Sequence, residues 1–217
     1  MTSLILLEMP GTYGLKPWFQ NRLRPLVRTL AAAGVTANQV TVCGGALSVA
    51  FGVFLLISRD PRYFALLPAV LLLRLALNAM DGMLAREFGQ ASRLGVYLNE
   101  LADVVSDTFL YVPFAHLQGV SIFWTWVAVV LAVISEMAGT VAAMTGASRR
   151  FDGPLGKSDR AFVFGAAGLW AGLAGGLPAR VAYVLPRLTA ALLVLTVVNR
   201  VRKGLQEIER EDQHATV

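Results

Sequence analysis

The sequence has little charge and a single cysteine. Only 15% of its 217 residues are charged, while 56% are hydrophobic; a soluble domain carries roughly 25% charged residues. This shortage of charge, with a mean hydropathy of +0.60, excludes a water-soluble globule, and the apolar content excludes a disordered chain. Because Cys43 is the sole cysteine, an intramolecular disulfide framework and a cysteine-based zinc site are excluded as well. We expect Cys43 to be a small buried apolar residue.

The sequence is rich in long apolar runs. A transmembrane helix needs about 20 mostly apolar residues, and six stretches approach that length. They are approximately Ala37–Ser58, Tyr63–Ala85, Leu94–Ala115, Ser121–Thr145, Ala161–Leu177 and Val181–Val201. The last two are the weakest, because Pro178 and Pro186 interrupt the apolar pattern. The predicted fold class is therefore all-α, a polytopic membrane protein with six transmembrane helices.

Residues Leu15–Gly34 have a different pattern, in which basic residues alternate with apolar and aromatic ones. This pattern is typical of an amphipathic helix that lies on the membrane surface; an exposed helix packed on the bundle is the alternative. The predicted organisation is an N-terminal segment with this interfacial helix (1–36), a six-helix membrane domain (37–205) and a charged cytoplasmic tail (206–217).

The basic residues are unevenly divided between the two sides of the predicted bundle. If both termini face the cytoplasm, 14 Lys and Arg residues lie on the cytoplasmic side and 4 lie on the other; those four are Arg59, Arg62, Arg180 and Arg187. Cytoplasmic loops carry an excess of basic residues, so we expect both termini on that side. The net charge of +5 then fits anionic membrane lipids, and we expect no nucleic-acid partner.

Polar residues gather where the second predicted span ends and the third begins. Ionisable residues inside spans are costly and indicate function. On the second span, Asn78, Asp81 and Ala85 share one helix face. On the third span, Asn99, Asp103 and Asp107 share another. A helical hairpin places the two faces opposite each other, and Mg²⁺ takes such oxygen ligands together with bound phosphates. The spacing predicts a metal and diphosphate site. The alternative is a buried polar network that holds two helices together, in which Asp81 pairs with Arg74 or Arg86 and the asparagines bridge the helices by amide hydrogen bonds.

Three neighbouring residues suit a diphosphate. Gly82 and Ala85 leave room for phosphates to approach the backbone, and Arg86 can pair with phosphate. The active site is therefore expected at the cytoplasmic surface of the membrane.

This block resembles the signature of the CDP-alcohol phosphatidyltransferases, Asp-x2-Asp-Gly-x2-Ala-Arg-x8-Gly-x3-Asp-x3-Asp. The matching residues are Asn78, Asp81, Gly82, Ala85, Arg86, Gly95, Asn99 and Asp103. Residues Val35–Thr41 are similar to the stretch that opens the family's first membrane helix, and Gly153–Arg160 to the basic loop that opens its fifth. The chain looks most like a bacterial inner-membrane branch of the family.

The resemblance implies a phosphotransferase of phospholipid biosynthesis. Such an enzyme moves a phosphatidyl group, or a related phosphoalcohol, from a CDP-alcohol such as CDP-diacylglycerol to a hydroxyl acceptor and releases CMP. It uses Mg²⁺ or Mn²⁺, and many members are homodimers. The implied roles are metal binding by Asn78, Asp81, Asn99 and Asp103, nucleotide and diphosphate binding by Asp81, Gly82, Ala85, Arg86 and Gly95, and general base catalysis by Asp103.

Two signature aspartates are asparagines in this chain, Asn78 and Asn99. An amide oxygen ligates a metal without negative charge, so we expect weaker metal binding and one strong metal position in place of two. Glu100 and Asp107 are nearby auxiliary carboxylates. A catalytically impaired scaffold that binds CDP-lipid is the alternative function; a transporter is disfavoured because the polar residues cluster at one membrane face.

Other polar residues have two interpretations each. Asn38 and Thr41 either contact the nucleotide or cap the first helix, and Glu136 either faces the site or pairs with Arg74. A basic cluster is a candidate site for an acceptor or lipid phosphate, with ordinary positive-inside topology as the alternative. Its candidate ligands are Arg149, Lys157 and Arg160.

Overall fold

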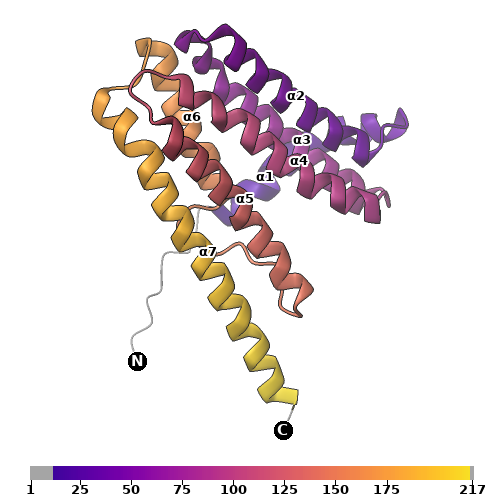
Figure 1. Cartoon of the computed structure of the whole chain (residues 1–217). Helices are drawn as coiled ribbons and strands as arrows, with labels where there is room; N and C mark the ends of the chain where they lie inside the picture. The colour runs from indigo at the N-terminus through magenta and orange to yellow at the C-terminus, as the bar shows by residue number, and fades with distance from the viewer. Residues whose placement is uncertain (1–11, 216–217) are drawn as a thin grey trace.

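Helices form all the regular structure in the described part of the chain. The computed structural model describes residues 12–215, with the side chains of residues 18–213. Its elements are α1 (Thr12–Ala32), α2 (Ala37–Ser58), η1 (Pro61–Leu66), α3 (Leu67–Glu87), α4 (Arg93–Tyr111), η2 (Val112–His116), α5 (Ile122–Met144), α6 (Lys157–Ala174) and α7 (Ala179–Ala215). Figure 1 shows α2, α3 and α4 side by side, and α5 beside α7, whose C-terminal part extends beyond the other helices.

Four of these helical segments are long and apolar enough to cross a membrane. They are Ala37–Ser58, Pro61–Glu87, Ile122–Met144 and Ala179–Gln213. The prediction of an all-helical membrane protein is confirmed to this extent. The other two predicted spans correspond to α4 and α6, which are 19 and 18 residues long and carry four and three charged residues. Their charge lowers their hydropathy, and for them the span assignment stays a prediction.

The two terminal segments of the predicted organisation are helical where they are described. In the N-terminal segment, α1 packs on α3 through the buried Val27, while Trp18 and Leu26 are exposed. Exposed apolar side chains on a helix that is packed on the bundle fit a helix at a membrane surface. The predicted tail continues α7 without a break as far as Ala215. Residues 1–11 and 216–217 of these segments lie outside the described residues.

Helix caps fix where α2 and α4 begin. The Thr36 hydroxyl accepts a hydrogen bond from the Gln39 backbone N–H (3.2 Å), and the Gln39 side chain accepts one from the Thr36 N–H (2.9 Å). This capping box means that α2, the first predicted membrane helix, is capped by Thr36 and not by Asn38 or Thr41. Ser92 caps α4 by accepting from the Gly95 N–H (2.9 Å). Both helices therefore begin at the same end of the bundle, beside the end of α3.

Cys43 is exposed on α2, so the expectation of a buried thiol is wrong. The buried face of α2 contains Val40, Gly44, Ser48 and Leu55, and Cys43 lies off that face. In a membrane span the outward positions are as apolar as the core, so an apolar residue type does not indicate burial there.

Gly52 allows α2 and α4 to approach closely. A Cβ at this position would lie 2.1 Å from the Phe109 carbonyl oxygen, whereas a Cβ on Gly44 would meet Leu77 at 3.5 Å. We expect Gly52→Ala to destabilise the protein by about 1–3 kcal/mol, the usual cost of overpacking. Gly44→Ala is the matched control in the same helix, and its effect is expected to be neutral or favourable because alanine favours helix. Thermal unfolding in detergent measures both; equal losses in Tm would contradict the close approach.

Candidate active site

Side chains of α2, α3 and α4 surround a polar cavity of about 370 Å³ where α2 and α4 begin and α3 ends. Seven of the eight signature positions line this cavity, and Asp103 does not. The lining residues include Asn38, Thr41, Asn78, Asp81, Gly82, Ala85, Arg86, Gln90, Gly95, Asn99, Glu100 and Arg149. The predicted convergence of the two helix faces is therefore present in the structure.

Asp81 lies at the inner wall of this cavity and is 7% exposed. Its carboxylate accepts a hydrogen bond of 2.7 Å from the Thr41 hydroxyl. Among the described residues, neither Arg74 nor Arg86 forms an ion pair with it. Thr41 therefore orients Asp81 from α2, and the alternative in which Asp81 ties two helices together through an arginine is not what the structure contains.

The signature glycines make room for two side chains that point over the cavity. A Cβ on Gly95 would lie 2.8 Å from Asn38 Oδ1, and a Cβ on Gly82 would lie 3.0 Å from a guanidinium nitrogen of Arg86. Arg86 thus folds back along α3 toward its own helix. The space expected for phosphates beside Gly82 is bordered by a cation that can bind them.

Asp103 lies beside the cavity and is held by three donors. Its Oδ1 accepts hydrogen bonds from Asn78 Nδ2 (3.0 Å) and from Arg74 Nη2 (3.2 Å), and its Oδ2 forms an ion pair with Lys157 Nζ. A carboxylate has about four lone-pair sites, so one site stays open. An aspartate at position 78 has no N–H to donate, so the asparagine there gives this chain a contact that the family signature lacks.

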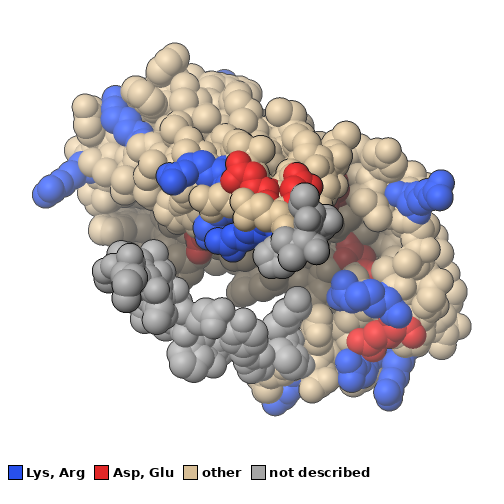
Figure 2. All heavy atoms as spheres, turned by 90° about the horizontal axis from the view of Figure 1, so that it is seen from below, with Lys and Arg blue, Asp and Glu red and all other residues tan. Residues whose placement is uncertain are grey.

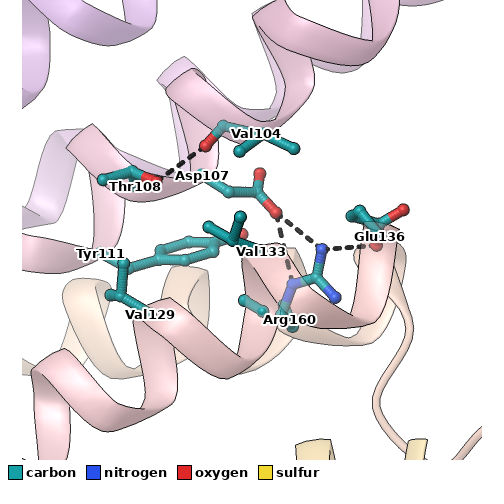
Figure 3. Close-up of a pocket in the computed structure, with 9 residues that line it drawn as sticks. Val104, Asp107, Thr108, Tyr111, Val129, Val133, Glu136 and Arg160 are labelled. Atoms are coloured by element: carbon teal, nitrogen blue, oxygen red, sulfur yellow. Dashed lines mark hydrogen bonds and ion pairs between the residues drawn. The ribbon is translucent and has the colours of Figure 1, made fainter. Parts of the chain in front are cut away.

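Asp107 and Arg160 belong to a buried ion-pair cluster. Arg160 is 1% exposed and lies between Asp107 (2.9 Å) and Glu136 (2.9 Å), as Figure 3 shows. Arg74 also binds Asp107, and Arg200 lies 3.5 Å from Glu136. Glu136 therefore pairs with α6 and α7 and also lies 3.8 Å from Arg149, and no ion pair joins it to Arg74 among the described residues. Sequence spacing did not indicate this cluster, because its members come from five helices.

Glu100 and Arg149 meet across the mouth of the polar cavity. The two guanidinium nitrogens of Arg149 bind the two carboxylate oxygens of Glu100, one of them at 2.7 Å. Arg149 belongs to the segment between α5 and α6, and Glu100 is on α4. The pair leaves neither residue free to act alone as an auxiliary metal ligand or phosphate ligand.

The cavity fits one divalent cation better than two. No group of three or more His, Cys, Asp or Glu side chains able to hold a metal occurs in the part of the chain that the structure describes. Among the described residues, Asp81 is the lining carboxylate without an ion pair to a basic residue, and Thr41, Asn78 and Asn99 bring hydroxyl and amide oxygens to the same cavity. Mg²⁺ is commonly bound by one or two carboxylates plus substrate phosphates. These residues therefore suit a single ion held together with a diphosphate.

We expect Asp81→Asn to weaken Mn²⁺ binding and Asn99→Asp to strengthen it, each by about tenfold or more, since tenfold corresponds to only about 1.4 kcal/mol. Asn99 is the clean position for adding charge because no hydrogen bond of its side chain occurs among the described residues, whereas Asn78 donates to Asp103. Mn²⁺ titration followed by electron paramagnetic resonance measures both, in the presence of a CDP-lipid. Binding that is unchanged in Asp81→Asn would refute a metal role for the cavity.

A second cavity, of about 720 Å³, lies between α1, α3 and α6. It adjoins the first, because Asn78 and Arg86 line both. Its wall is apolar apart from one polar end. The apolar lining includes Trp18, Phe19, Leu71, Leu72, Leu75, Ala79 and Ala161, and the polar end includes Arg74, Asn78, Arg86, Lys157 and Ser158. Figure 2, seen from below relative to Figure 1, shows acidic and basic side chains next to one another around a hollow in that face of the molecule.

Comparison with known proteins gives concordant results. Residues 34–201 match the family model described as CDP-alcohol phosphatidyltransferase. The chain is 42% identical over 196 residues to the inner membrane protein YnbA of Escherichia coli, covering 89% of this chain and 96% of that protein. A stretch of 95 residues is 33% identical to the archaetidylinositol phosphate synthase of Pyrococcus horikoshii, covering 43% of this chain and 47% of that protein.

Solved structures have the same fold. The phosphatidylinositol phosphate synthase of Mycobacterium tuberculosis with CDP-DAG bound has a TM-score of 0.69 at 22% identity, covering 83% of this chain and 92% of that one. Its complex with manganese and citrate gives the same TM-score and identity, covering 83% and 88%. The long family match, the 42% identity and the signature residues gathered around one cavity lead to one conclusion: this chain belongs to the CDP-alcohol phosphatidyltransferase family.

Proposed function

We propose that the protein transfers a phosphatidyl group from CDP-diacylglycerol to a hydroxyl acceptor and releases CMP. The observation that carries this proposal is the pair of adjoining cavities, one polar and one apolar, with Asn78 and Arg86 in both walls. A CDP-lipid has the same two parts, a polar nucleotide diphosphate and apolar chains. The CDP-DAG complex of the mycobacterial relative with this fold supports the choice of donor.

The donor is then divided between the two cavities. The nucleotide and diphosphate occupy the polar cavity, with Gly82, Ala85 and Gly95 at its wall and Arg86 against the phosphates. The acyl chains lie in the apolar cavity between α1, α3 and α6. Arg86, at the boundary, holds the diphosphate where the two parts of the donor join.

Asp81, with the amide oxygens of Asn78 and Asn99, would hold a Mg²⁺ or Mn²⁺ ion against the diphosphate. Such an ion neutralises charge that develops on the diphosphate and on the departing CMP. Thr41 fixes the Asp81 carboxylate by a hydrogen bond of 2.7 Å, so the ligand is oriented before the ion binds.

Asp103 acts on the acceptor. The acceptor oxygen forms a bond to the phosphorus that carries the lipid, and the bond from this phosphorus to the bridging oxygen of the diphosphate breaks. CMP leaves with that electron pair, and the hydroxyl proton passes to the open lone-pair site of Asp103. Asn78, Arg74 and Lys157 hold the carboxylate in one orientation, as in-line transfer requires.

The exposed and buried faces of α4 support its assignment as a membrane span. The buried positions of α4 include Ser106 and Asp107, whereas Leu94, Tyr97 and Leu101 are exposed. An outward apolar face and an inward polar face suit a helix surrounded by lipid. We infer six spans with α1 on the surface, both termini and the site on the cytoplasmic side of a bacterial inner membrane, and a homodimer as the family resemblance implies.

The test is CMP release by the purified full chain in liposomes that contain CDP-diacylglycerol and Mn²⁺, with a panel of alcohols as acceptors. We expect release that depends on both metal and acceptor. Saturable CDP-lipid binding without release for any acceptor would instead support the alternative, a catalytically impaired scaffold, which the asparagines at positions 78 and 99 motivate.

A further inference from the structure

We propose that the acceptor is an alcohol without a phosphate or carboxylate group, and that Glu100 sets this preference by occupying Arg149. This inference rests on the proposed transferase function and names the substrate class of the same site. Of the basic side chains that line the two cavities, all but one form an ion pair with a carboxylate of the protein; such a paired side chain is called a matched cation below.

Arg149 is the first matched cation. It lines the polar cavity and its side chain is 31% exposed, which is the setting of a phosphate ligand. Its two terminal nitrogens are nevertheless both bound to Glu100, and its guanidinium carbon lies 5.0 Å from the centre of the Phe151 ring. A two-bond Arg–carboxylate pair satisfies the edge of the guanidinium that a phosphate would use.

Lys157 is the second matched cation. It lies at the polar end of the apolar cavity, and its ammonium forms an ion pair with Asp103. The ammonium has further N–H donors, but a phosphate bound to them would stand directly beside Asp103, the carboxylate that takes the proton. Two anions at this distance repel each other.

Other basic residues around the site are matched as well. Arg160 and Arg200 are each 1% exposed; Arg160 pairs with two carboxylates, and Arg200 donates to the carbonyls of Ser135 and Asp152.

Asp152, in the segment before α6, binds Arg150 of the same segment and Lys203 of α7, each at 2.8 Å. Burial raises the pKa of the Asp152 carboxyl, but the hydrogen bonds from Lys203 and Arg150 outweigh it and hold that pKa below its usual value. Asp152 is therefore charged at neutral pH, and together with Glu207, which also pairs with Arg150, it neutralises these two cations.

Arg86 is the exception. It is exposed, it lines both cavities, and it has no acidic partner among the residues that the structure describes. In the proposed reaction this arginine binds the diphosphate of the donor, because the two cavities meet at Arg86. A phosphorylated acceptor brings a further charge of about −1.5 to −2, which would be placed among Asp103, Glu100 and the diphosphate. Anions without counter-charge in a partly desolvated site are costly.

An alcohol without an anionic group avoids this cost. Its oxygen bonds to the lipid-bearing phosphorus, its proton passes to Asp103, and CMP leaves as in the proposed reaction. The ion pairs of Lys157 and Arg149 then stay in place throughout. Glu100 is in this sense a specificity-determining residue: with Arg86 taken by the diphosphate, it occupies Arg149, the other arginine of the polar cavity, which would otherwise attract a phosphorylated acceptor.

The activity test uses acceptors that differ only by a phosphate. The full chain in CDP-diacylglycerol liposomes with Mn²⁺ is assayed for CMP release with glycerol against glycerol 3-phosphate, and with inositol against inositol phosphate. We expect kcat/KM for the unphosphorylated member to be at least about tenfold higher. Glu100→Gln is expected to reduce this ratio about tenfold by freeing Arg149. Glu209→Gln, at an exposed position of α7, is the charge-matched control and is expected to leave the ratio unchanged.

A binding test decides the matter without turnover. Glycerol 3-phosphate is titrated calorimetrically into protein loaded with CDP-diacylglycerol and Mn²⁺. We expect no saturable binding at millimolar concentration by the wild type or Glu209→Gln, and saturable binding by Glu100→Gln. Binding by the wild type that Arg149→Ala or Lys157→Ala abolishes would overturn the proposal. Absence of CMP release with every acceptor would refute the transferase function, while the titration would still measure the charge preference.

Discussion

Asp103→Asn is expected to lower acceptor-dependent CMP release by about 10²- to 10⁴-fold, the usual contribution of a general base. The asparagine oxygen can still accept the hydrogen bonds that Asn78 and Arg74 donate to Oδ1, so the surroundings of residue 103 keep two of their three contacts. The amide nitrogen replaces Oδ2, and the ion pair with Lys157 is lost. What is lost is the ability to take the acceptor's proton. Steady-state CMP release at saturating donor and acceptor measures the effect on kcat.

Asp60→Asn is the matched control for this substitution. Asp60 caps η1 through the Arg62 N–H at 2.9 Å, and asparagine caps helices equally well. We expect the control to release CMP at the wild-type rate. The role of Asp103 would be refuted if Asp103→Asn kept more than a tenth of wild-type kcat, or if its loss were explained by an equal loss of donor binding.

Arg160→Met should destabilise the protein by about 3–5 kcal/mol, the cost of removing one partner from a buried ion pair. The substitution leaves Asp107 and Glu136 buried together without Arg160 between them. Methionine fills much of the arginine stem's volume, so lost packing adds little. Thermal unfolding in detergent, followed by tryptophan fluorescence, measures the fall in Tm.

Two variants make this result specific. Lys203→Met breaks an exposed pair with Asp152 (side chain 54% exposed), and we expect a change of no more than about 1 kcal/mol. The double variant Arg160→Met/Asp107→Asn leaves Arg74 paired with Asp103 and Arg200 with Glu136, and it is expected to recover part of the loss. A double variant less stable than Arg160→Met alone would show that the ion pairs are not the cause.

The sequence predicted the parts of the site that follow from helical spacing. The signature residues of α3 and α4, from Asn78 to Asn99, line one cavity because i, i+3 and i+4 neighbours share a helix face. The sequence also predicted an all-helical membrane protein, since apolar length is a local property. The number of spans is harder to predict, because the charged residues of α4 and α6 lower the hydropathy of these helices, and the sequence alone does not show that these charges are paired inside the protein.

The partners of these residues could not be predicted. Lys157 reaches Asp103 from α6, and Arg149 reaches Glu100 from the segment after α5. Such contacts depend on how distant helices pack, which spacing within one helix does not specify. Asn78 illustrates the limit most clearly: its residue type suggested a weakened metal ligand, whereas its amide nitrogen donates to Asp103.

The buried ion-pair cluster has a consequence for how the chain is assembled. Asp107 and Glu136 belong to α4 and α5, while Arg160 and Arg200 belong to α6 and α7 and are synthesised later. Until α6 is made, the basic partners available to these carboxylates among the described residues are Arg74, which binds Asp107, and Arg149, which lies 3.8 Å from Glu136. The carboxylates of α4 and α5 therefore obtain their full set of ion pairs only after α6 and α7 have been synthesised. Although the signature lies in α3 and α4, the fold around it is completed only when the last helices arrive.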